Sequence, residues 1–229
     1  NALNVIPSFF TFALFPIIAR QVQNSIEDAR RTFRMSAKLL MLVALPLAAS
    51  VTIMAPLMIQ LLGGEAFLPH GYIALQVVIW SIPFGWLNSV TNYVLISLGQ
   101  ERLQTRAFII GVSFNVVGNL ILLPRFSYVG AGLTTIASEI ILLLIFNYYL
   151  VQKMPHVEWV KLLWRPVAVT AVMIMAMLLL TQLNVWLALI VGLALYPSGL
   201  WLLHVFGEEE QRILRSLLPE KIATRLRLA

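Results

Sequence analysis

Glu139 is the one acidic residue that lies within a long apolar stretch of the sequence. If that stretch crosses a membrane, an ionised side chain at its centre costs roughly 2.5–3.5 kcal/mol and is expected to face a cavity or a partner. One interpretation is a carboxylate that couples an ion or gates a cavity. The other is a protonated side chain that hydrogen-bonds a neighbouring helix, with Thr135 one turn earlier on the same face.

Asparagines recur in two pairs within apolar stretches, Asn88 with Asn92 and Asn115 with Asn119. A spacing of four residues places both members of a pair on one face of a helix. Such amide stripes can line a polar cavity and bind hydroxyl groups. They can equally hydrogen-bond between helices, where each bond contributes under about 1 kcal/mol on average.

Enzyme signatures are absent from the sequence. It has no cysteine, no nucleotide-binding GxxxxGK[ST] loop, and neither an HExxH nor a Gly-x-Ser-x-Gly motif. The three histidines, His70, His156 and His204, stand too far apart to form a ligand motif. We therefore expect no enzymatic activity, no cofactor and no metal site.

The elements that must position these residues are membrane helices. The 229 residues are 60% hydrophobic and 11% charged, with a mean hydropathy of +0.87. Soluble domains carry about 25% charged residues, and disordered chains have little apolar surface to bury, so both classes are excluded. Runs such as VAVTAVMIMAMLLL lack the alternation of membrane β-strands. The predicted fold class is an all-α polytopic membrane protein.

Hydropathy predicts about seven transmembrane helices, since each crossing needs roughly 20 apolar residues. The predicted spans are 1–19, 39–62, 72–98, 107–123, 129–150, 166–183 and 185–206. Almost no loop separates the last two around Asn184, so they should form an antiparallel hairpin.

Basic residues predict how these spans are oriented. Fifteen of the sixteen Lys and Arg residues fall in alternate segments, and Arg125 alone falls in the others. The basic segments are 20–38, 99–106, 151–165 and 207–229. Cytoplasmic loops carry this excess, so Asn1 is predicted outside and the C-terminus in the cytoplasm of an inner (plasma) membrane. The net charge of +6 then reflects these basic cytoplasmic loops, so membrane lipids are expected partners and nucleic acid is not.

Two basic segments, 20–38 and 207–229, have the pattern of amphipathic helices. In the first, Ser25 and Asp28 form a loose capping box. Its apolar residues share one face: Val22, Ile26, Ala29, Phe33 and Ala37. Such a helix either couples two spans as a lever or lies on anionic lipid, and the composition favours the lipid surface.

Four local motifs occur in a recognisable order. They are LFPIIAR at 14–20, IQLLGGEAFLPHGYIALQVV at 59–78, SLGQERLQTR at 97–106 and FNVVGNLILLPRFSYVGAGLTTIASE at 114–139. Their order resembles the C-terminal half of polysaccharide flippases in the multidrug/oligosaccharidyl-lipid/polysaccharide exporter superfamily.

The resemblance implies half of a fourteen-helix, two-lobe transporter. Residues 1–150 would form a C-terminal lobe lacking its first helix, 166–206 an accessory hairpin, and 207–229 a cytoplasmic amphipathic tail. The implied function is alternating-access translocation of a polyprenyl-pyrophosphate-linked oligosaccharide for cell-surface polysaccharide biosynthesis. A polysaccharide polymerase and a ligase are the candidate protein partners.

Under this interpretation Glu139 couples an ion or gates the cavity, and Arg20 contacts the headgroup at the cytoplasmic side. The expected sugar contacts are Asn88, Asn92, Asn115 and Asn119. Two alternatives remain open: a cation-coupled drug antiporter of the same superfamily, and a non-transporting scaffold for polysaccharide assembly. The sequence does not specify the saccharide or the ion.

Overall fold

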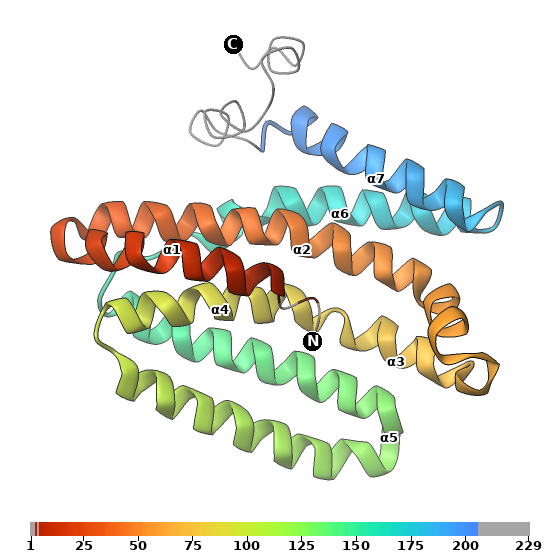
Figure 1. Cartoon of the computed structure of the whole chain (residues 1–229), viewed down its shortest axis with the longest axis horizontal. Helices are drawn as coiled ribbons and strands as arrows, with labels where there is room; N and C mark the ends of the chain where they lie inside the picture. Colours follow the sequence, from red (N-terminus) through yellow and green to blue (C-terminus); the bar gives the residue numbers. More distant parts are fainter. Residues whose placement is uncertain (1–2, 4, 206–229) are drawn as a thin grey trace.

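The computed structural model describes residues 3 and 5–205, and within them every regular element is a helix (Figure 1). This confirms the all-α fold class. The α-helices are α1 Val5–Asn24, α2 Ile26–Gly63, α3 His70–Val78, α4 Ser81–Ser97, α5 Glu101–Val151, α6 Trp159–Thr181 and α7 Val185–Leu202, with a short 3₁₀ helix at Glu65–Phe67.

α5 contains two antiparallel spans in one continuous run. A straight helix of its 51 residues would far exceed a hydrocarbon core about 30 Å thick, at about 1.5 Å per residue. Ser127 instead has φ 51° and ψ −136°, and the ribbon turns back on itself there (Figure 1). Among the described residues, six helices are long and apolar enough to cross a membrane, with α3 and α4 taken together. Because α5 folds back at Ser127, its two halves each have the length of one span, which agrees with the seven predicted spans.

The reversal of α5 requires glycine at position 130. A Cβ atom on Gly130 would lie 2.6 Å from the carbonyl oxygen of Leu122, so the two halves meet backbone to backbone just past the bend. The Thr134 hydroxyl donates to the Gly130 carbonyl at 2.8 Å and fixes the first turn of the second half. Further along, a Cβ on Gly118 would lie 2.7 Å from Thr134 Cγ2. The two halves are therefore closely packed from the bend onward.

The connections between helices gather at two ends of the bundle (Figure 1). The α1–α2, α4–α5 and α5–α6 connections share one end, which we call the basic end. The α2–α3 connection, the bend of α5 and the α6–α7 turn share the opposite end. This grouping matches the one that the distribution of Lys and Arg predicts.

The predicted amphipathic segment at 20–38 divides between α1 and α2. Ser25 is the N-cap of α2, and its hydroxyl accepts from the Asp28 backbone N–H at 3.3 Å. From there α2 continues without interruption into its membrane span. Phe33 is fully buried and meets the Trp159 ring edge-on at 5.8 Å, while Arg30 donates to the His156 carbonyl at 2.8 Å. Protein therefore covers this apolar face, which corrects the lipid-surface interpretation and favours coupling between spans.

α6 and α7 form the predicted hairpin, although α6 begins at Trp159 rather than at residue 166. Pro166 consequently lies inside the helix, where its carbonyl accepts from the Thr170 hydroxyl. Hydropathy alone missed this earlier start because the first turns of α6 contain Lys161 and Arg165. At the opposite end, Asn184 caps α7 by accepting from the backbone of its first turn.

Two cations hold the end of α7, where helix carbonyls carry partial negative charge. The Arg165 guanidinium donates to the His204 carbonyl at 2.9 Å, and the Lys38 ammonium donates to the Val205 carbonyl. These bonds join α7 to α6 and α2 at the basic end. The predicted tail at 207–229 and the predicted placement of Asn1 lie outside the described residues.

Candidate functional site

The basic-end half of the bundle is densely packed. Phe33, Trp86 and Phe146, from α2, α4 and α5, belong to one core cluster, and each is at most 1% exposed. Burial of aromatic side chains on this scale dominates core energetics. Any open space in the lobe is therefore expected between the middle of the bundle and the opposite end.

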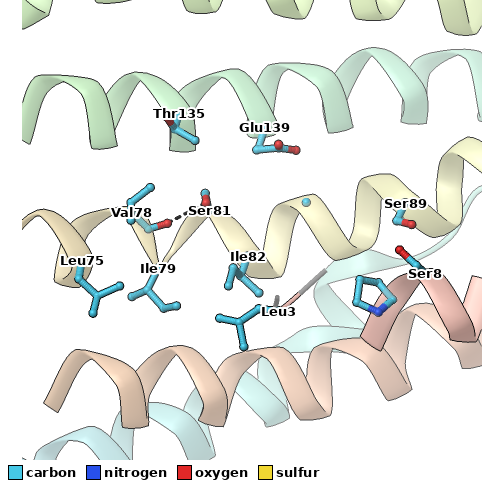
Figure 2. Close-up of a pocket in the computed structure, with 12 residues that line it drawn as sticks. Leu3, Ser8, Leu75, Val78, Ile79, Ser81, Ile82, Ser89, Thr135 and Glu139 are labelled. Atoms are coloured by element: carbon cyan, nitrogen blue, oxygen red, sulfur yellow. Dashed lines mark hydrogen bonds between the residues drawn. The ribbon is translucent and has the colours of Figure 1, made fainter. Parts of the chain in front are cut away.

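A cavity of about 450 Å³ occupies that region, between α1, the α3–α4 segment and the second half of α5 (Figure 2). It is lined by Leu3, Pro7, Ser8, Leu75, Val78, Ile79, Ser81, Ile82, Gly85, Ser89, Thr135 and Glu139. The wall thus presents polar and apolar surface in nearly equal parts, with four hydroxyl groups and one carboxyl group among its polar groups. Ligand sites commonly combine an apolar wall with a few convergent polar groups.

Glu139 lines this cavity and also has a partner. Asn88 Nδ2 donates to Glu139 Oε2 at 2.7 Å and to the Glu139 carbonyl at 2.9 Å, which joins α4 to the second half of α5. The carboxyl group lies over Gly85, where a Cβ atom would be 3.6 Å from Oε2. The structure is therefore compatible with both interpretations of Glu139. Its side chain is hydrogen-bonded to a neighbouring helix, and it also lines a cavity.

The cavity is lined by a stripe of small residues that the sequence interpretation missed. Ser81, Gly85 and Ser89 recur every four residues along α4, so they share one helix face. Ser8 of α1 faces this stripe, and Figure 2 shows its hydroxyl turned toward Ser89. The four-residue spacing of these small residues could have predicted the stripe from the sequence. Serines and glycines with this spacing, however, also pack between membrane helices without forming a cavity.

None of the four predicted asparagines is among the residues that line this cavity. Asn88 lies behind it, with its side chain bonded to Glu139. Within the described part of the chain, no group hydrogen-bonds the buried Oδ1 atoms of Asn88 and Asn92. Arg20 is exposed near the end of α1 and likewise does not line the cavity.

Asn115 and Asn119 lie between the two halves of α5. Asn115 Nδ2 donates to Ser138 Oγ at 3.0 Å, and Asn119 Nδ2 donates to Asn115 Oδ1 at 3.0 Å. The first bond joins the two halves and favours the interhelical alternative for Asn115, while the second ties Asn119 to Asn115 within the first half. The role of Asn115 and Asn119 in sugar binding stays a prediction. A double substitution distinguishes sugar binding from a purely structural role.

An Asn115→Leu, Asn119→Leu double variant is expected to keep transport activity and to lose about 1 kcal/mol of stability, because interhelical hydrogen bonds in membranes contribute amounts of this order. The measurements are the transport assay described below and the midpoint of denaturation in detergent. A stable double variant that no longer transports would instead assign these amides to the substrate path.

Chemically, the cavity offers hydroxyl groups, one carboxyl group and a hydrocarbon wall, a set suited to binding a polar ligand by hydrogen bonds. Among the described residues, no three His, Asp or Glu side chains gather as a metal site.

The chain is similar in sequence and in fold to known membrane proteins. The family model of MatE matches residues 2–121. The uncharacterized membrane protein MJ1068 of Methanocaldococcus jannaschii is 26% identical over 170 residues, which cover 73% of this chain and 33% of that protein. The solved structure of the lipid II flippase MurJ, in an inward closed conformation, has a similar fold with a TM-score of 0.71. Its sequence identity is 14%, over 88% of this chain and 45% of the flippase.

The chain thus spans about a third of the curated relative and under half of the solved structure. The fold similarity extends beyond the family match, because it covers 88% of the chain. The family match includes α1 to α4 and most of the first half of α5. This chain is a multi-pass membrane protein that belongs to the MatE family, within the multidrug/oligosaccharidyl-lipid/polysaccharide exporter superfamily.

Proposed function

We propose that this chain forms one half of a flippase that moves a polyprenyl-pyrophosphate-linked oligosaccharide across the cytoplasmic membrane. The observation that carries the proposal is the cavity containing Glu139, which lies at membrane depth in a MatE-family fold. Its hydroxyl groups suit the hydroxyl-rich headgroup of a lipid-linked saccharide. The similarity in fold to a lipid II flippase favours a lipid-linked substrate.

The proposed mechanism is alternating access between the two membrane faces. The packed core closes the basic end, and the cavity occupies the other half of the lobe. We assign the basic end to the cytoplasm because positive charge accumulates there. In this arrangement the bond between Asn88 and Glu139 joins two cavity walls, and its making or breaking would gate the space between α4 and α5.

A cation-coupled drug antiporter is the second candidate, because Glu139 itself lines the cavity. Both candidates use the same carboxyl group and differ in cargo. A non-transporting scaffold would leave the cavity without a role. The polymerase and ligase partners belong to the flippase proposal and would act on its product at the outer leaflet.

The test uses the full-length gene in its own cell. After deletion of the gene, the accessibility of polyprenyl-linked oligosaccharide to a membrane-impermeant glycosidase is measured in spheroplasts. A flippase predicts that the lipid accumulates protected on the inner leaflet and that the wild-type gene restores access. Normal access in the deletion strain, with no redundant transporter present, would contradict the proposal and favour the antiporter or the scaffold.

A further inference from the structure

An aromatic cluster adjoins the cavity on α1 and α4. The Tyr93 ring contacts Phe15 with centroids 5.6 Å apart and Phe12 at 6.1 Å, with tilted rings in both pairs. These separations lie in the range of favourable aromatic contacts. Phe12 is nevertheless 66% exposed, so much of its ring surface is left uncovered by the described residues.

The cluster continues the polar wall of the cavity by one helical turn. Phe12 follows Ser8 by four residues on α1, and Tyr93 follows Ser89 by four residues on α4. Residues four apart share a helix face about one turn, or 5.4 Å, apart. The two helices that supply facing serines to the cavity therefore supply facing aromatic rings beside it, on the side toward the basic end.

A saccharide ring can contact both the aromatic cluster and the polar cavity wall beside it. Its axial C–H bonds form an apolar face that packs on the electron-rich face of an aromatic ring, while its hydroxyl groups project from the edge. The cluster offers aromatic rings, Ser8 and Ser89 offer hydroxyl groups one helical turn away, and Glu139 lies further along the same cavity, over Gly85. A purely lipidic ligand would have no use for that polar wall.

We infer that Phe12, Phe15 and Tyr93 form a stacking platform for a sugar ring of the transported headgroup. This inference rests on the proposed function and deepens it, since it assigns the saccharide, rather than the polyprenyl pyrophosphate, to this face of the lobe. The adjoining cavity wall receives the hydroxyl groups of the same sugar.

The experiment compares two probe lipids on the purified full-length protein: undecaprenyl pyrophosphate carrying N-acetylglucosamine, and undecaprenyl pyrophosphate without sugar. Binding is measured by native mass spectrometry. The wild type should prefer the glycosylated lipid. A Phe12→Leu, Tyr93→Leu variant should lose about tenfold in affinity for the glycosylated lipid, the effect of a ring-stacking contribution of this size, and bind the bare lipid unchanged.

Two matched variants control for packing. Tyr93→Phe keeps the ring and should retain the preference, while Phe9→Leu removes an exposed ring of α1 that lies outside the cluster and should also retain it. An unchanged preference in the double variant would overturn the platform. An equal loss for both lipids would also overturn it, because the rings would then only pack against protein. The same loss in Phe9→Leu would overturn it as well, because the effect would not be specific to the cluster.

The remaining outcomes separate this inference from the proposed function. If the wild type binds both lipids equally, the platform is wrong while a lipid-pyrophosphate cargo still stands. If the wild type binds neither lipid, the proposed function itself fails, and the cluster loses its assigned ligand with it.

Discussion

Substitution of Glu139 by glutamine is expected to reduce transport at least about tenfold while the protein folds and inserts normally. Glutamine keeps an oxygen that can accept from Asn88 Nδ2, so the bond between α4 and α5 survives. The variant removes only the ionisable group, which is costly at this depth and is expected to serve function there. The measurement is the glycosidase-access assay in a deletion strain that carries the variant gene.

Two further variants sharpen this result. Glu139→Leu removes both the charge and the side-chain hydrogen bond, so its transport should be at least as low and its stability lower, because the buried Asn88 amide keeps only the backbone carbonyl of residue 139 as an acceptor. Glu158→Gln is the matched control, because it makes the same exchange of a carboxyl for an amide at an exposed position. There the hydrogen bond from Lys161 lowers the pKa of the Glu158 carboxyl. This control variant should transport normally. Full transport by Glu139→Gln would reduce Glu139 to a hydrogen-bonding role.

Substitution of Gly130 by alanine is expected to lower stability by about 1–3 kcal/mol, the usual range for overpacking. The added methyl group would lie 2.6 Å from the Leu122 carbonyl oxygen, and a backbone atom cannot move away without opening the bend of α5. The measurement is the midpoint of denaturation of the purified protein in detergent.

Gly111 provides the control for this prediction because it lies in the same helix. A Cβ atom there would lie 3.7 Å from Leu142 Cδ1, an ordinary contact distance. Gly111→Ala should therefore change the midpoint little. Equal midpoints for the two variants would show that the two halves of α5 are not closely packed at the bend.

Hydropathy and charge were sufficient for the overall organisation of this chain. Apolar stretches of the right length predict helices because the bilayer admits few other structures, and the arrangement of connections at two ends follows from alternating crossings. The break between the predicted spans 107–123 and 129–150 likewise predicts the reversal of α5. The residue that makes the bend is harder to predict: Ser127 has the unusual backbone angles, and its residue type does not indicate that role.

The site was harder to predict, because its contacts join residues distant in sequence. Glu139 stood out by charge and depth, but its partner Asn88 is 51 residues away, and the pairing depends on how α4 packs against α5. Asparagine spacing identified Asn88 without indicating which neighbour it would bond. The sequence did not predict Ser8, Ser81 and Ser89 as cavity residues, because small polar residues are common in membrane helices.

The bend of α5 also brings the surrounding bilayer close to the cavity. The first half of α5 exposes a broad apolar surface, with Leu120 72% exposed, and the second half carries Glu139. Because the halves are closely packed, a tilt of the first half in response to hydrophobic thickness would be carried to the cavity wall. Bilayers of different thickness would then be expected to change the shape of the cavity through the first half of α5, which contributes none of the residues that line it.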